Sequence, residues 1–285
     1  MNNSQKNNIK YITSIDIPEL DIFSKASEPQ LVHYYEPEEG LFIVESPEVI
    51  SRAVSAGYDP IAVLTEGRYL ETSDFSLIKS CPNIYVADIE EMVKITGFNL
   101  TRGLLAAFRR KPFEPISDFL KGKKRIAILE NVVNPTNIGA IFRSAAAMYA
   151  DGIILTPDCS DPLYRRASRV SMGNVFQVPW TYFPGSADDW YNEGPNLIKN
   201  HGFSLIATAL CDTSIPINDS QVIASEKLAV FLGSEGFGLK DSTIESCDFK
   251  TIIPMSNNVD SLNVAAASAV VFWELFAKPS LSPKQ

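Results

Sequence analysis

The chain has 285 residues, 45% of them hydrophobic and 21% charged, which is enough for one large or two modest globular domains. No apolar run reaches the roughly 18 residues that a membrane span needs, and the N-terminus lacks a targeting pattern, so we expect a cytoplasmic protein. The formal net charge of −9 is unfavourable for a protein that binds RNA, because affinity for nucleic acid comes largely from Lys and Arg at the phosphates.

Cysteine and histidine are too sparse to predict a metal site. The four cysteines are Cys81, Cys159, Cys211 and Cys247. They lie far apart without a CxxC pair, and the chain has only two histidines. Because a zinc site needs closer ligand spacing, we expect reduced, buried thiols and no bound metal.

The first half of the chain alternates strands and helices. Residues 1–30 are polar and irregular, which indicates an N-terminal extension. Hydrophobic periodicity then predicts strands at 41–46, 61–65 and 83–88, and helices at 47–56, 88–96 and 101–109. This alternation is typical of a small α/β domain, which we place at residues 31–112. The following KPFEPISDFLKGKK, with two prolines and a basic end, indicates a linker at 113–124.

The second half, residues 125–285, predicts a parallel sheet. Mostly continuous apolar runs predict strands at 125–130, 152–156, 203–210, 228–233 and 251–255. Such runs are typical of parallel strands that are covered on both faces. Helices are predicted in the gaps, at 137–150, 163–173, 187–200, 239–246 and 261–277. In such an α/β domain, ligands collect beyond the carboxyl ends of the strands.

The segment 130–155 combines a buried stripe with a cation outside it. With the 3.6-residue period of a helix, one apolar stripe faces the core. It consists of Ile138, Ile141, Phe142, Ala145, Met148 and Tyr149. Arg143 lies off this stripe, and Gly139, one turn earlier, leaves room for a substrate. The helix N-terminus around Asn137 offers free N–H groups to an anion. Taken alone, these residues also fit a solvated Arg and an ordinary Asn cap.

Residues 164–180 contain a basic cluster, Arg165, Arg166 and Arg169, within one and a half turns of a predicted helix. Such a cluster can face RNA phosphates, or it can be a solvated helix face.

Residues 228–239, LAVFLGSEGFGL, place glycines directly after a buried strand. Glycine allows backbone groups to come close to a ligand. The chain has no G-x-G-x-x-G turn after an early strand with an acidic residue about 20 positions later, which disfavours a Rossmann-type cofactor site.

Residues 252–277 predict a strand, a ligand-sized loop and a helix that opens at Asp260 or Ser261. One stripe of this helix consists of Leu262, Ala265, Ala269, Phe272, Trp273 and Phe276. The opposite side is small or apolar too, and a helix that is apolar all round is normally buried on every side. We therefore expect a second copy of the chain against it, although a central core helix would have the same pattern.

These stretches resemble the three motifs of the SpoU (TrmH) family of SPOUT RNA methyltransferases. Asn137, Gly139 and Arg143 match the first motif, and Gly-Ser-Glu-Gly at 233–236 matches the second. Ile-Pro-Met at 253–255, followed by Val-Asp-Ser-Leu-Asn-Val, matches the third. The first half resembles the L30e-like substrate-binding domain often found ahead of this catalytic domain. One departure is Tyr149, where many members have glycine; we expect an adjusted helix end there.

The resemblance implies a deep trefoil knot in the C-terminal SPOUT domain and S-adenosylmethionine bound in it. It also implies methyl transfer to a ribose 2′-hydroxyl of rRNA or tRNA, whereas the homodimer through the C-terminal domain is expected from the apolar helix at 261–277. The implied catalytic residues are Arg143, Asn137, Glu235, Ser261 and Asn263. The implied cofactor-binding residues are Thr208, Ala209, Leu210, Leu232, Gly233, Ser234, Glu235, Gly236, Ile253, Pro254, Met255, Ser261, Leu262 and Asn263. The family has a similar Ser, Gly and Pro pattern around this basic cluster. The resemblance therefore implies that RNA is contacted by Arg165, Arg166 and Arg169.

The family assigns Arg143 to activating the hydroxyl. Because a guanidinium stays protonated, with a pKa above about 12, we expect it to clamp a phosphate and stabilise negative charge on oxygen. Two rival interpretations remain from the sequence: a noncatalytic RNA-binding protein that keeps the knot as a scaffold, and an α/β enzyme that acts on a small nucleotide.

Overall fold

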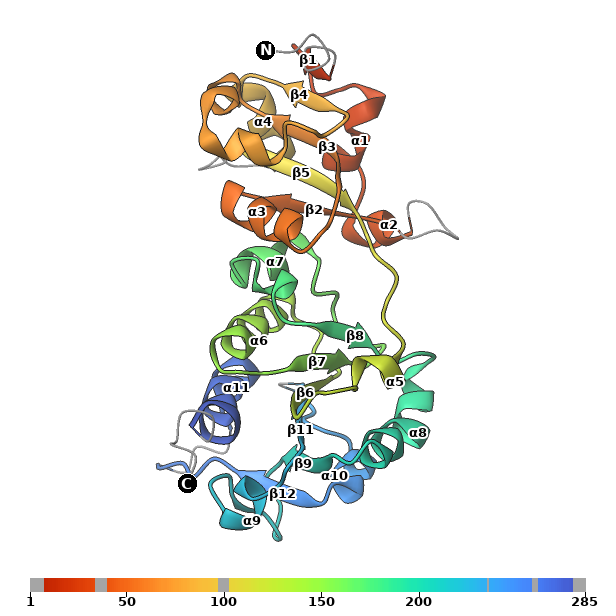
Figure 1. Cartoon of the computed structure of the whole chain (residues 1–285), viewed down its shortest axis with the longest axis vertical. Helices are drawn as coiled ribbons and strands as arrows, with labels where there is room; N and C mark the ends of the chain where they lie inside the picture. Colours follow the sequence, from red (N-terminus) through yellow and green to blue (C-terminus); the bar gives the residue numbers. More distant parts are fainter. Residues whose placement is uncertain (1–7, 34–39, 97–102, 235, 258–260, 279–285) are drawn as a thin grey trace. The chain divides into compact units, whose positions relative to one another are not determined.

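The computed structural model describes residues 8–33, 40–96, 103–234, 236–257 and 261–278 (Figure 1). It divides into two compact units. The N-terminal unit consists of Met1–Pro112 and Leu163–Phe176, and the C-terminal unit consists of Phe113–Pro162 and Gln177–Gln285. No helix among the described residues has both the length and the apolar character to cross a bilayer.

A five-stranded sheet in the order β1-β4-β3-β5-β2 forms the centre of the N-terminal unit. Its strands are β1 (Ile9–Tyr11), β2 (Leu41–Glu45), β3 (Pro60–Thr65), β4 (Ile84–Val86) and β5 (Leu104–Arg109). The α-helices of this unit are α1 (Asp21–Ser24), α2 (Glu28–Val32), α3 (Pro47–Ser55), α4 (Ile89–Thr96) and α7 (Arg165–Val170). Single 3-10 turns are η2 (Pro18–Leu20), η3 (Gly67–Glu71), η4 (Ser73–Leu77) and η5 (Asn174–Phe176). The strands predicted at 41–46, 61–65 and 83–88 and the helices at 47–56 and 88–96 are confirmed.

The helix predicted at 101–109 is wrong, since its described part is β5, antiparallel to both β2 and β3. Leu and Ala favour helices, so the local composition was misleading. The strand lies between two neighbours, and Leu104 to Phe108 are buried without interruption. Burial of both faces of a central strand outweighs a weak local helix propensity.

The C-terminal unit is a seven-stranded sheet in the order β10-β12-β9-β11-β6-β7-β8, and each of its pairings is parallel. The strands are β6 (Arg125–Glu130), β7 (Gly152–Leu155), β8 (Trp180–Tyr182), β9 (Ser204–Thr208), β10 (Ile215–Pro216), β11 (Leu228–Gly233) and β12 (Phe249–Ile252). The predicted α/β class with a parallel sheet is therefore confirmed. The short strands β8 and β10 were not predicted, and β12 ends at Ile252 rather than at Met255.

Helices cover both faces of this sheet (Figure 1). They are α5 (Ile116–Phe119), α6 (Pro135–Ala147), α8 (Ala187–Asn200), α9 (Ser220–Ile223), α10 (Asp241–Ser246) and α11 (Val264–Phe272), which continues as a π-helical turn, Trp273–Ala277. On one face α5, α8 and α10 bury a core around Trp190 and Phe231. On the other face α6 packs against α11, and α11 also contacts β11. The two faces thus surround the strands whose ends build the site.

The start and the buried side of α11 differ from the prediction. Asn263, not Asp260 or Ser261, is its N-cap: the side chain accepts hydrogen bonds from the backbone N–H groups of Ala265 and Ala266. The buried residues of the helix and its π turn are Val264, Ser268, Val271, Phe272, Leu275, Phe276 and Ala277. Leu262 and Trp273 of the predicted stripe are exposed, because the later start and the π turn shift the face that meets the sheet.

The end of α6 also departs from the predicted stripe. Tyr149 is 54% exposed rather than buried, and its φ is +61°. The helix ends at Ala147, so Tyr149 lies two residues beyond it in the left-handed conformation that closes many helices. This conformation explains the preference of the family for glycine at this position, since only glycine adopts it without a steric penalty.

Candidate active site

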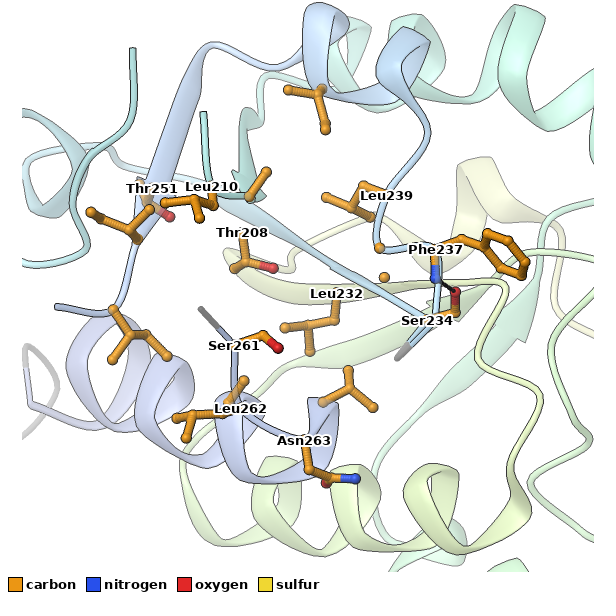
Figure 2. A pocket seen from close by; sticks show the side chains of 18 of the residues that line it. Thr208, Leu210, Leu232, Ser234, Phe237, Leu239, Thr251, Ser261, Leu262 and Asn263 are labelled. Carbon is orange, nitrogen blue, oxygen red and sulfur yellow. Dashed lines mark hydrogen bonds between the residues drawn. The ribbon is translucent and has the colours of Figure 1, made fainter. Parts of the chain in front are cut away.

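A pocket of about 730 Å³ opens at the carboxyl ends of β9, β11 and β12. Figure 2 shows Thr208 and Leu210 from the end of β9, Leu232 from β11, and Ser261 and Leu262 ahead of α11 around the same space. Apolar side chains therefore alternate with hydroxyl groups on its wall. Such a lining can hold a mixed ligand, with a flat apolar part and polar groups that fix its orientation.

The loop after β11 folds back over its own start. The N–H of Gly238 donates to the carbonyl oxygen of Ser234 at 2.9 Å, and these two residues form an isolated antiparallel bridge. A Cβ at Gly233 would lie 2.3 Å from the backbone carbon of Gly238 and 2.5 Å from the nitrogen of Leu239. Position 233 therefore has to be glycine if the loop is to keep this path, and this path forms one wall of the pocket.

The end of β9 is held in place by hydroxyl groups. Thr208 Oγ1 donates to the carbonyl oxygen of Phe231 at 2.7 Å, which ties β9 to β11. Ser214 Oγ donates to the carbonyl oxygen of Ala209 at 2.7 Å and accepts from the N–H of Cys211 at 3.1 Å. The contact with Ser214 is also the largest cause of the lowered pKa of the Cys211 thiol. These bonds fix the turn that contributes Ala209 and Leu210 to the pocket.

The first and third motifs meet at a hydrogen bond between two asparagines. Asn263 Nδ2 donates to Asn137 Oδ1 at 3.3 Å, while Asn263 Oδ1 caps α11. Asn137 lies in the first turn of α6 and is 6% exposed. Since Asn263 lines the pocket, this bond places the N-terminal end of α6 beside it.

Arg143 is the cation that α6 offers to solvent. It is exposed, and its side chain makes no hydrogen bond or ion pair with any other residue that the structure describes. The neighbouring Phe142 is fully buried and meets Trp180 edge-on, with ring centroids 6.3 Å apart. The buried side of α6 is thus anchored in the core, and its guanidinium is available to an anionic substrate.

Residues 124–273, more than half of the chain, match the family model of the SpoU rRNA Methylase family. The chain belongs to the SpoU family. A tRNA/rRNA methyltransferase of Mycobacterium bovis, described as uncharacterised, is 35% identical over 261 residues, 91% of this chain and 88% of that protein. The 23S rRNA (guanosine-2′-O-)-methyltransferase RlmB of Acinetobacter baylyi is 29% identical over 67% of this chain and 77% of its own length.

The fold of this SpoU protein is also that of solved structures. The AdoMet-bound rRNA methyltransferase from Sinorhizobium meliloti superposes with a TM-score of 0.79 and 22% identity, covering 96% of this chain and 99% of that one. This similarity concerns the fold. Together with the family match, it makes the chain an RNA methyltransferase of the SpoU family.

Most of the residues predicted to bind the cofactor of a SpoU protein gather around the pocket. Those that line it are Thr208, Ala209, Leu210, Leu232, Gly233, Ser234, Ile253, Met255, Ser261, Leu262 and Asn263. Gly236 and Pro254 are not among the lining residues. The predicted Glu235 lies outside the described residues. Their roles stay predictions.

Sequence reasoning missed part of the pocket wall. Phe237, Gly238 and Leu239 line it directly after the second motif, as do Asp241 and Ile244 of α10. The first three could have been found, since the glycine loop continues through them. The α10 residues gave no signal, because a short helix of mixed composition has no pattern that points to a ligand.

The basic residues predicted to contact RNA lie in the N-terminal unit, although the chain enters α7 from the C-terminal unit. Arg165 pairs with Glu45 at 2.6 Å, and Arg169 pairs with the same carboxylate at 3.5 Å. Arg165 Nε is buried without a hydrogen-bond partner in the described structure. These pairs fasten α7 to the end of β2, and Phe176, just beyond α7, packs on Phe42 with centroids 5.7 Å apart.

Proposed function

We propose that this protein transfers a methyl group from S-adenosylmethionine to a ribose 2′-hydroxyl of rRNA or tRNA. The cofactor of SpoU methyltransferases is S-adenosylmethionine, and we place it in the pocket at the ends of β9, β11 and β12. The observation that carries the proposal is the Asn263–Asn137 hydrogen bond, since it brings the helix of Arg143 beside that pocket. The name of the RlmB relative, a guanosine-2′-O-methyltransferase, supports the ribose as the acceptor.

The residues of the pocket suit this cofactor. At Gly238, which lines the pocket, a Cβ would meet nothing within 4 Å, so the backbone there is open to main-chain contacts with an adenine edge. Leu210, Leu232 and Leu262 offer apolar surface to a flat ring. When bound, the sulfonium supplies a methyl group that is already electrophilic, so the protein has only to align the acceptor and help it lose a proton.

The chain's own residues would bind and orient the acceptor. Arg143 would clamp the phosphate next to the target ribose and stabilise negative charge as it develops on the 2′-oxygen. Asn137 and Asn263 would hold α6 and α11 in register, so that the guanidinium stays at a fixed distance from the pocket. Alignment of this kind can lower a barrier by up to about 7 to 11 kcal/mol in favourable cases. Ser261 and Glu235 are proposed to position the ribose and the cofactor.

Substitution of Arg143 tests the mechanism. Arg143→Ala should bind S-adenosylmethionine as the wild type does, because the guanidinium touches no described residue, but it should lose most methyl transfer. Arg143→Lys is the matched control: it keeps the charge but not the planar fork, so partial activity is expected. Calorimetry measures binding, and mapping of 2′-O-methyl positions in total RNA with and without the gene identifies the target. Wild-type turnover by Arg143→Ala would remove this residue from the mechanism.

The finer architecture is also proposed. We infer a trefoil knot in the C-terminal unit, supported by β12 lying between β10 and β9 while the following α11 returns to α6. We further propose an L30e-like RNA-binding domain at residues 31–112, an N-terminal extension that adds β1 to its sheet, a linker at 113–124 that includes α5, and a methyltransferase domain at 125–285 from which α7 joins the N-terminal unit. The basic residues Arg165, Arg166 and Arg169 stay our proposed RNA contacts, with Glu45 competing for two of them.

A homodimer through α11 is proposed on the apolar residues that this helix leaves exposed. Val270 is 40% exposed and Trp273 49% exposed, and Leu262, just ahead of the helix, is 41% exposed. A large side chain such as Trp is typical of the centre of an interface. Sedimentation at micromolar concentration tests this, and a monomer there would contradict it.

A further inference from the structure

Glu130 is a buried carboxylate at the end of β6 that no step of the proposed reaction uses. It is 1% exposed. Its Oε1 accepts the backbone N–H of Lys240 at 2.8 Å. Its Oε2 accepts the indole N–H of Trp190 at 3.0 Å and the hydroxyl of Thr243 at 2.7 Å. Burial of a charged group at this depth is costly unless every oxygen is matched by donors, as it is here.

The three donors make a carboxylate the best acceptor at this position. The groups from Lys240 and Trp190 are N–H donors and cannot accept, whereas the Thr243 hydroxyl can do both. A glutamine at position 130 has one accepting oxygen and one NH₂ group. Its NH₂ would therefore face one of the two N–H donors, whichever way the amide is turned.

Glu130 lies beside both ends of the loop that borders the pocket. Glu130 lies opposite Gly233 in the register of β6 and β11, where the loop begins. Lys240, whose N–H it binds, is the residue at which the loop ends and α10 starts. Thr243 lies on α10, the helix that contributes Asp241 and Ile244 to the pocket wall.

We infer that Glu130 is a positioning residue of the cofactor pocket: it sets where the loop 234–240 ends and where α10 begins. This inference rests on the proposed function, because it takes the pocket to be the site of S-adenosylmethionine. Trp190 serves as an internal reference, since its indole N–H binds the same carboxylate but its side chain is buried in the core and does not itself line the pocket.

Four full-length proteins test the inference: wild type, Glu130→Gln, Trp190→Phe, and the double variant. The readouts are the Kd for S-adenosylmethionine from calorimetry and the midpoint of thermal unfolding. Glu130→Gln should raise the Kd about tenfold, the effect of losing about 1.4 kcal/mol. Trp190→Phe should lower the unfolding midpoint but bind like the wild type, because the bond to Lys240 remains.

The double variant separates positioning from general stability. With the indole N–H removed, the glutamine can accept from Lys240 with its oxygen and donate to the Thr243 hydroxyl with its NH₂ group. The double variant should therefore bind more tightly than Glu130→Gln alone, despite carrying two core substitutions. A purely structural role predicts the reverse, with binding no better than in the single variant.

Each outcome decides the question. A wild-type Kd in folded Glu130→Gln, or no rescue in the double variant, would overturn the inference while leaving the proposed function intact. If the wild type itself releases no heat with S-adenosylmethionine, the proposed function fails and this inference with it. If Glu130→Gln does not fold, Thr243→Val replaces it: its Kd should rise while that of Trp190→Phe does not, and an unchanged Kd would contradict the inference.

Discussion

Gly233→Ala, which adds one methyl group to the second motif, should strongly weaken cofactor binding. The new Cβ would lie 2.3 Å from the backbone carbon of Gly238 and 2.5 Å from its oxygen. Carbon atoms pack at about 3.5 to 4.0 Å, so the returning loop has to move by more than about 1 Å. Such a move would strain or break the 2.9 Å bond between Gly238 and Ser234 and would shift Phe237 and Leu239 on the pocket wall.

The size of the expected loss in activity follows from this displacement of the loop. A misplacement of about 1 Å can cost on the order of 10²-fold in rate even when it is remote from the chemistry. We expect at least this loss in methyl transfer and a matching loss of affinity for S-adenosylmethionine, measured by calorimetry. The strands beneath the loop should persist, since Gly233 is the last residue of β11.

The chain offers a matched control in the same loop. A Cβ at Gly236 meets no described atom within 4 Å, so Gly236→Ala makes the same chemical change where space is open. Because the predicted contacts of Gly236 to the cofactor come from its main chain, which alanine keeps, Gly236→Ala should bind the cofactor much better than Gly233→Ala. Equal binding by the two alanine variants, whether both normal or both impaired, would refute the steric reasoning.

Two further predictions concern stability and thiol chemistry. Tyr149→Gly should raise the thermal unfolding midpoint, because a left-handed conformation costs a side-chain residue about 1 to 2 kcal/mol and this side chain is 54% exposed; a lower midpoint would show that its contacts matter more than the strain. Cys211, whose pKa is lowered, should be alkylated first by iodoacetamide near neutral pH. Burial raises the pKa of Cys159 to about 11 and of Cys247 to about 12, so mass spectrometry should find both modified only at higher pH, and early labelling of either would contradict their burial.

The sequence predicted the elements with a continuous or periodic pattern. The buried runs of β6, β7, β9 and β11 and the 14-residue amphipathic α8 lie where expected. The prediction was wrong for β5, where strand pairing with distant segments outweighs local helix propensity. It was also wrong for the buried side of α11, which the π turn shifts. Short strands such as β8 have no pattern long enough to recognise.

The candidate site was predictable only in its loops. The second and third motifs identify residues at the ends of β11 and β12, because such loops carry glycine, hydroxyl and amide groups at fixed spacing, and the first motif identifies α6. The residues at the end of β9 lie outside the three motifs and were predicted from the family resemblance alone. The role of Glu130 could not be found in this way. Its partners are 60, 110 and 113 residues away in the chain, and each is an ordinary residue in its own local context.

The division of the chain has a practical consequence for anyone who wishes to isolate one unit. The backbone crosses from one unit to the other three times, after Pro112, after Pro162 and after Phe176. A fragment that starts at Phe113 would carry α7 without the β2 carboxylate and aromatic ring that hold it, leaving two arginines and Phe176 without their contacts. To isolate the C-terminal unit, α7 should also be removed, and a short peptide should join Pro162 to Gln177. A single cut at the linker would leave α7 in the fragment.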